Sequence, residues 1–79
     1  MPSGLLFITS PDCHLCERGH KLLAELGLET REIDVGSREA QALAARGLPL
    51  IFLPVLTDGE RVIARSRFSS KRVRKELSL

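Results

Sequence analysis

The 79-residue sequence predicts an α/β fold with the element order β-α-β-α-β-β-α. Three observations lead to this prediction: apolar runs of strand length, stretches with apolar residues at helical spacing, and an Asp58-Gly59 pair between two short apolar segments. The composition agrees, because 43% hydrophobic and 28% charged residues are typical of one compact folded unit. We therefore expect a single domain over residues 1–79.

The first half of the chain has the pattern of two strands, each followed by a helix. Residues 5–8 form an apolar run that fits a strand buried on both faces. Apolar residues then recur at helical spacing over residues 13–26, and Gly27 follows as a C-terminal cap. Residues 28–35 alternate between polar and apolar side chains as a second strand does. A second helix over residues 37–46 should begin at an N-cap Ser37 and end at Gly47; its expected buried residues are Ala40, Leu43 and Ala44.

The second half predicts a hairpin and a last helix. Pro49 and Pro54 exclude one uninterrupted inner strand in this part of the chain. Residues 55–57 and 61–64 are expected to pair around an Asp58-Gly59 turn. Ser69 or Ser70 should then cap a helix that places Val73 and Leu77 inward and Lys71, Arg72, Arg74 and Lys75 outward.

The three phenylalanines and the charge distribution limit the classes of partner. Phe7 and Phe52 are expected in the core, and Phe68 is expected to anchor the last helix. Residues 60–79 carry seven basic and two acidic side chains, although the whole chain has a net charge of only +2. Without Trp or Tyr the chain offers no stacking platform for single strands, so we expect no nucleic-acid binding. The basic end is either a solvated helix face or a docking surface for an acidic patch of a redox partner.

Membrane segments and secretion signals are not predicted. The apolar run 48–55 contains two prolines and is far shorter than the ~18 residues of a spanning helix. Residues 1–4 carry no basic side chain, and the following run 5–8 is shorter than a secretory core of about 7 to 15 residues. We expect a cytoplasmic monomer without membrane contact.

The two cysteines, Cys13 and Cys16, are the residues most suited to chemistry. A disulfide between them would close a tiny loop and contribute little to stability. A C-x-x-C pair between an apolar strand and an amphipathic helix is typical of a redox site. The N-terminal end of a helix favours an anion, so we expect Cys13 to be the nucleophilic thiolate and Cys16 to resolve the mixed disulfide. Asp12 is expected to cap this helix.

The chain resembles the short glutaredoxin-like proteins of the thioredoxin superfamily over essentially its whole length. The resemblance rests on Ser10-Pro11-Asp12-Cys13-His14-Leu15-Cys16, Leu53-Pro54-Val55-Leu56, the Asp58-Gly59 hairpin and the basic last helix. It implies a thioredoxin-like fold, with a central four-stranded mixed sheet flanked by three helices. It also implies a thiol-disulfide oxidoreductase that acts on protein or small-molecule disulfides without a tightly bound cofactor.

The resemblance also implies roles for individual residues. Pro54, rather than Pro49, corresponds to the cis-proline that faces the C-x-x-C and holds a substrate in an extended pose. Substrate-binding positions are then Leu53, Pro54, His14 and Leu15, and Arg65 and Arg67 are candidates for docking a partner.

The electron donor is left open between glutathione and thioredoxin reductase with NADPH. Glutathione-using members usually carry Cys-Pro-Tyr-Cys, Thr-Val-Pro and a Gly-Gly pair. Here His14-Leu15 replaces Pro-Tyr, Leu53 precedes Pro54, and Arg65-Ser66-Arg67-Phe68 occupies the Gly-Gly region.

Other interpretations of the same residues stay open. The pair could be inert, could carry a metal or an iron-sulfur cluster, or could form a zinc site together with His20, although a structural zinc needs a fourth ligand. His14 could favour the neighbouring thiolate or simply face solvent. The whole domain could be a non-catalytic binding module that uses its basic face.

Overall fold

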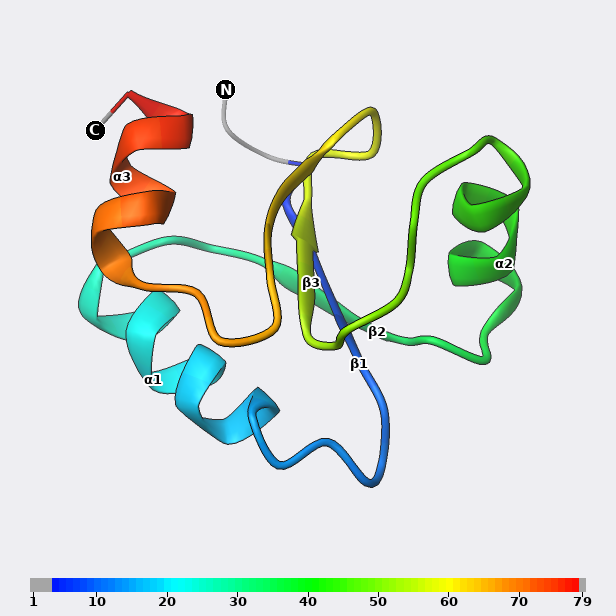
Figure 1. The fold of residues 1–79 in the computed structure, drawn as a ribbon, viewed down its shortest axis with the longest axis horizontal. Coiled ribbons are helices and arrows are strands. Elements are labelled where there is room, and N and C mark those ends of the chain that lie inside the picture. The colour runs from blue at the N-terminus through cyan, green and yellow to red at the C-terminus, as the bar shows by residue number, and fades with distance from the viewer. Residues whose placement is uncertain (1–3, 79) are drawn as a thin grey trace.

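The computed structural model describes residues 4–78, so the expectation for residues 1–3 lies outside the described residues. The elements follow the predicted order (Figure 1). They are β1 (Leu6–Thr9), α1 (Cys16–Glu25), β2 (Arg31–Asp34), α2 (Arg38–Ala45), β3 (Val55–Thr57), β4 (Val62–Arg65) and α3 (Ser70–Leu77). None of the helices in this part of the chain has the length and apolar character needed to cross a bilayer.

The four strands form one mixed sheet in the order β2-β1-β3-β4. Strand β1 pairs parallel with β2 and antiparallel with β3, and β3 pairs antiparallel with β4. In this register Phe7 lies opposite Glu32 on one side and Leu56 on the other. The first strand of the chain is therefore central, which explains its continuous apolar sequence.

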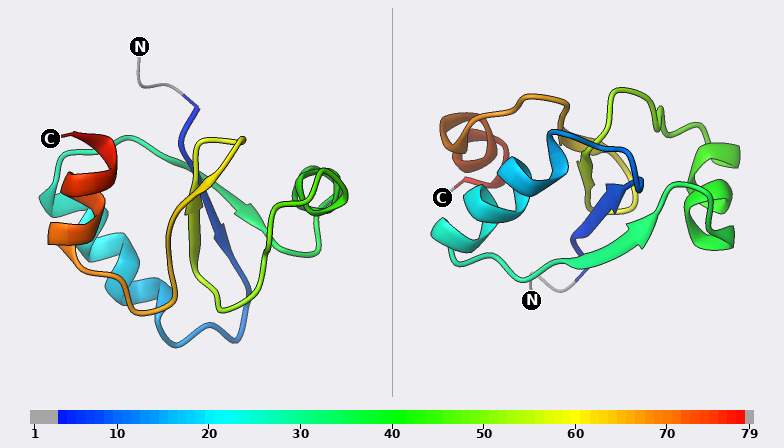
Figure 2. Two further views of the ribbon diagram at one scale, coloured as in Figure 1. Left: turned by 45° about the horizontal axis from the view of Figure 1, so that its top comes forward. Right: turned by 90° about the horizontal axis from the view of Figure 1, so that it is seen from below.

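Helices cover both faces of the sheet (Figure 2). Because side chains alternate along a strand, Phe7 and Leu56 face α1 and α3, whereas Ile8 and Val55 face α2. The first core contains Leu5, Phe7, Leu23, Leu56, Ile63, Ala64, Phe68 and Val73. The second contains Leu6, Ile8, Ile33, Ala40, Leu43, Leu48 and Val55. The sheet thus forms the middle of three layers.

Helix α1 begins at Cys16, so the prediction that it starts at Cys13 was wrong. The backbone N–H of Cys13 donates to the carbonyl of Ser10 at 3.2 Å, which closes a turn instead of a helical step. Leu15 occupies the N-cap position without a side-chain hydrogen bond, so the expected cap by Asp12 does not form. Cys13 consequently precedes the helix and Cys16 opens it.

The end of α1 also shortens the second strand relative to its prediction. Gly27 has a φ of 70°, and its N–H donates to the carbonyl of Ala24 at 3.0 Å, as expected for a C-terminal cap. The N–H of Leu28 donates to the carbonyl of Leu23, so this residue completes the helix end. Strand β2 therefore occupies only Arg31–Asp34 of the expected segment 28–35.

Helix α2 confirms its predicted N-cap. The Ser37 hydroxyl accepts the N–H of Ala40 at 3.2 Å. Ala40 and Leu43 are buried as expected, but Ala44 is exposed. The buried face is narrower than predicted because only one side of this short helix meets the sheet.

Helix α3 takes Ser69, not Ser70, as its N-cap, and the Ser69 hydroxyl accepts the N–H of Arg72 at 3.2 Å. Val73 is fully buried and packs in the same core as Phe68, which confirms Phe68 as the anchor of this helix. Leu77 is partly buried, and the basic residues predicted to face outward are exposed: Lys71, Arg72, Arg74 and Lys75.

The β3–β4 hairpin is closed by the side chain of Asp58. Its carboxylate accepts the backbone N–H of Arg61 at 3.0 Å and that of Glu60 at 2.9 Å. These hydrogen bonds hold the pKa of Asp58 below its ordinary value of 3.8. The folded state therefore gains stability from this carboxylate above about pH 3.8, and loses it as the pH falls through the lower folded-state pKa.

Substituting Asp58→Asn should reduce stability at pH 7, and the difference from the parent protein should shrink as the pH falls toward 2. The amide oxygen can still accept the turn hydrogen bonds, but it carries no charge to strengthen them. Urea unfolding midpoints between pH 7 and pH 2 would measure the difference between the two proteins. Asp12→Asn, which removes one exposed carboxylate outside the hairpin, is the control. A constant difference across this pH range would contradict the role assigned to the Asp58 charge.

Candidate functional site

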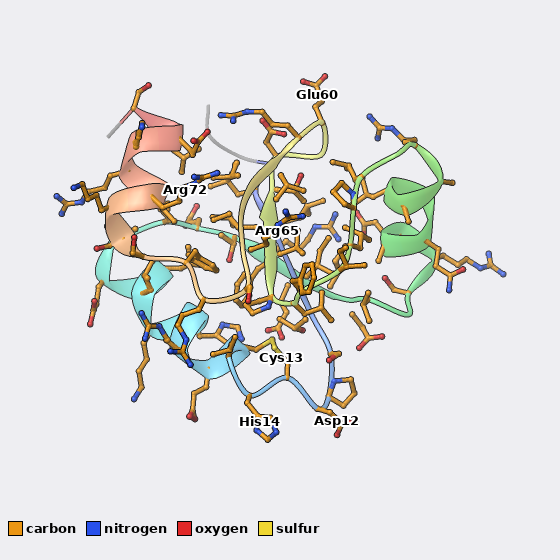
Figure 3. The ribbon with its side chains drawn as sticks, in the orientation of Figure 1. Asp12, Cys13, His14, Glu60, Arg65 and Arg72 are labelled. Atoms are coloured by element: carbon orange, nitrogen blue, oxygen red, sulfur yellow. A yellow bond between two sulfur atoms is a disulfide. The ribbon has the colours of Figure 1, made fainter. Side chains whose placement is uncertain are left out.

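Cys13 and Cys16 are joined as a disulfide, with their Cα atoms 5.4 Å apart. Their exposure is unequal: Cys13 is half-buried, whereas Cys16 is buried with 7% of its surface exposed. In Figure 3 the side chain of Cys13 points toward the body of the protein from the loop that connects β1 with α1. An approaching molecule therefore meets Cys13 before Cys16.

Helix α1 packs closely against the sheet just after the two cysteines. Gly19 lies one turn after Cys16, and a Cβ atom at this position would be 2.7 Å from Cζ of Phe7 and 3.5 Å from Cγ of Pro54. Any side chain larger than hydrogen would push the helix or the Phe7 ring away. Gly19 thus sets how close α1, and with it Cys16, lies to the sheet.

An open pocket of about 510 Å³ lies beside the disulfide. Its lining residues are Ser10, Asp12, Cys13, His14, Leu15, Leu50, Ile51, Phe52 and Leu53. The structure thus brings Leu53, His14 and Leu15 together with Cys13. Pro54 is fully buried behind the pocket, and its peptide bond with Leu53 is cis, as the resemblance implies.

His14 and Asp12 stand at the outer rim of the pocket. Both are exposed, and their side chains point away from the body of the protein in Figure 3. Neither side chain takes part in a hydrogen bond or ion pair with another of residues 4–78. Their position suits contact with an approaching molecule more than a structural role.

Phe52 was expected in the core, and this prediction was wrong. It is 65% exposed, with a φ of 61°, and its neighbour Ile51 is 56% exposed. The left-handed backbone at Phe52 lies in the segment between α2 and the buried Pro54, where no regular period decides which side chains face inward. The missed signal was the pair of prolines, which already excluded a regular strand here.

Arg65 joins the site from β4. The N–H of Ser66 donates to the carbonyl of Pro54 at 2.8 Å, which ties the end of β4 to the segment before β3. The Arg65 guanidinium carbon lies 5.7 Å from the centre of the Phe52 ring, a cation–π contact. Arg67 instead lines a separate cavity of about 580 Å³ beside the start of α3, where Arg65 and Arg72 are also found.

His20 does not join the cysteines. Its Nε2 lies 3.3 Å from Oε1 of Glu32, and its ring meets the edge of Phe7 with the centroids 4.9 Å apart. Glu32 also accepts the hydroxyl of Thr9 at 2.8 Å. Among residues 4–78 there is no group of three or more His, Cys, Asp or Glu side chains placed to hold a metal ion, so the zinc arrangement with His20 does not form.

Comparison with known proteins found no matching protein family, no matching curated protein and no matching solved structure. The chemistry of the disulfide and its pocket is therefore the basis for the function proposed next.

Proposed function

We propose that the protein is a glutaredoxin-like thiol-disulfide oxidoreductase with a thioredoxin-like fold. It reduces protein or small-molecule disulfides by exchange through both cysteines. One observation carries this proposal: a half-buried Cys13 at the rim of an open pocket is paired with a buried Cys16. This asymmetry suits a reaction in which one sulfur meets the substrate and the other acts only on the first.

The reaction begins with the reduced protein. The Cys13 thiolate attacks one sulfur of the substrate disulfide, forms a mixed disulfide and displaces the other substrate sulfur as a thiolate. Cys16, after losing its proton to solvent, attacks the Cys13 sulfur and displaces the remaining substrate thiolate. Two electrons have then moved from the protein to the substrate, and the Cys13–Cys16 disulfide has formed, which is the state of the structure.

Three further features support the glutaredoxin-like assignment. The element order and the four-stranded mixed sheet with helices on both faces are compatible with it. The cis peptide bond before Pro54 is the one that the resemblance requires. Leu53 lines the same pocket as Cys13, so an extended substrate lying along residues 53 and 54 would present its sulfur to this cysteine.

We assign the activity to a cytoplasmic monomer, where a thiol donor returns the disulfide to two thiols. The donor is either glutathione or thioredoxin reductase with NADPH. An NADPH-oxidation assay with a model disulfide tests both, with glutathione and its reductase in one arm and thioredoxin reductase in the other. Turnover in either arm supports the proposal and identifies the donor. A Cys13–Cys16 disulfide that neither donor nor excess dithiol reduces would favour a non-catalytic binding module.

Replacing Cys16 by serine should stop the reaction at the mixed disulfide. The variant keeps the Cys13 thiol that attacks the substrate but lacks the second sulfur that releases it. Intact-mass spectrometry after reaction with a peptide disulfide should show about one peptide per protein. The control, Cys13→Ser with Cys16 intact, should capture little peptide because Cys16 is buried. Equal capture by the two variants would contradict the assigned roles.

A further inference from the structure

We propose that a surface beside Cys13, formed by Ile51, Phe52 and Arg65, selects disulfides in protein segments that carry an apolar side chain and a carboxylate next to the reactive cysteine. We name these three residues the selection patch. This inference rests on the proposed function and names its substrate class. The selection patch would act before the exchange, by holding the substrate over Cys13.

The apolar part of the selection patch faces solvent although its side chains are large. Ile51 and Phe52 are 56% and 65% exposed, and both line the pocket that contains Cys13. Scattered apolar residues on a surface need no explanation, but two adjacent ones at a reactive pocket form a continuous surface for a partner. The complementary group is an apolar side chain near the substrate disulfide.

The Phe52 ring has a cation as its neighbour. The guanidinium of Arg65 lies over it at 5.7 Å, and the hydrogen bond from Ser66 to Pro54 fixes the end of β4 beside this segment. A stacked pair of this kind presents a flat apolar surface with a cation at one side. A partner therefore meets an apolar ring and a positive charge side by side.

The charge of Arg65 is not neutralised by another residue of the described chain. Arg65 makes no ion pair with a carboxylate of residues 4–78, whereas Arg61 and Arg72 both pair with Glu76. In the view of Figure 3, Cys13 lies between Arg65 and Asp12, the one acidic residue that lines the pocket. A substrate carboxylate is thus attracted by Arg65 and repelled by Asp12.

A protein segment fits these properties better than glutathione does. Glutathione carries carboxylates that could meet Arg65, but it has no large apolar side chain for Ile51 and Phe52. The side chains of Ile51 and Phe52 would then stay exposed to solvent in the complex. A segment with an aromatic or aliphatic residue and an acidic residue around its cysteine would use all three residues of the selection patch.

The test compares short peptides in which one cysteine forms a mixed disulfide with thionitrobenzoate. Their central sequences are Phe-Cys-Glu, Ala-Cys-Glu, Phe-Cys-Gln and Phe-Cys-Lys. Reduced protein displaces thionitrobenzoate from the peptide sulfur, and the colour of the released thiolate gives a second-order rate constant without any electron donor. We expect Phe-Cys-Glu to react about tenfold faster than Phe-Cys-Lys at low salt, with a smaller ratio at high salt.

Variants separate the two parts of the selection patch. Arg65→Gln should abolish the preference for Phe-Cys-Glu over Phe-Cys-Lys, because Asp12 still repels the carboxylate. Phe52→Ser should remove the advantage of Phe-Cys-Glu over Ala-Cys-Glu. Arg38→Gln removes an equal charge from the exposed first turn of α2, outside the residues that line the pocket, and should keep both preferences. The Phe52 and Arg65 side chains are exposed, so both variants should fold.

The outcomes distinguish this inference from the proposed function. Equal rates for all four peptides, or an acidic preference that survives Arg65→Gln, would overturn the selection patch and leave the oxidoreductase intact. A glutathione–thionitrobenzoate disulfide that reacts as fast as Phe-Cys-Glu would overturn the choice of a protein segment. A reduced protein that reacts with no disulfide at all would overturn the proposed function itself.

Discussion

Cys13→Ser is expected to lower the rate of disulfide reduction by about 10³-fold or more, to the rate of the buffer alone. The nucleophile in thiol–disulfide exchange is a thiolate, and a serine hydroxyl does not ionise near neutral pH to replace it. The remaining thiol, Cys16, is buried and cannot reach an external disulfide without displacing the β1–α1 loop.

The measurement is the NADPH-coupled assay with whichever donor supports the parent protein. Loss of the disulfide should not unfold the variant, because a bridge over three positions restricts the unfolded chain only slightly. Circular dichroism and a urea titration would check this. Ser10→Ala, at the rim of the same pocket, is a control that leaves both sulfurs in place. A Cys13→Ser protein with full activity would refute the two-cysteine mechanism.

Phe7→Ala should produce the largest loss of stability among substitutions of single side chains. The ring has no exposed surface, lies on the central strand and fills the space left by Gly19. Truncating a buried phenylalanine costs about 3 to 5 kcal/mol. A domain of this length has a free energy of unfolding of roughly 4 to 12 kcal/mol, so the substitution removes between about a quarter and all of the stability.

Two variants make this prediction measurable even if Phe7→Ala does not fold. Phe7→Leu keeps most of the apolar volume and should cost about 1 to 2 kcal/mol in a urea titration. Phe52→Ala is the same truncation at an exposed position, and should change stability by less than about 0.5 kcal/mol. Equal effects of the Phe7 and Phe52 truncations would contradict the burial described for these rings.

The order of the elements could be predicted because the signals are local. A continuous apolar run marks the central strand, Ser37 supplies the side-chain oxygen that a helix start needs, and Asp58 closes the hairpin with its own carboxylate. Each of these signals acts within a few residues. The tertiary packing is consistent with each of these local signals.

The details of the site depend on longer-range geometry and were predicted less well. A helical pattern fits Cys13 as well as Cys16, and only the turn from Ser10 to Cys13 decides that the helix starts later. The outward position of Phe52 depends on the backbone path between α2 and Pro54. This segment has no regular spacing of apolar residues from which the side-chain directions could be predicted. Phe52 lies before β3 and Arg65 ends β4. No spacing in the sequence predicts that these two residues are in contact.

The position of β1 in the middle of the sheet also affects how the chain is made. Cys16 is synthesised before the sheet that buries it is complete, because β1 gains its partner β3 only after the 38 residues between Cys16 and Val55 have been added. At about 5 to 20 residues per second this takes roughly 2 to 8 seconds. Until β3 has paired with β1, Cys16 lacks the complete sheet that buries it in the folded protein. The protection of Cys16 belongs to the completed protein and not to the growing chain.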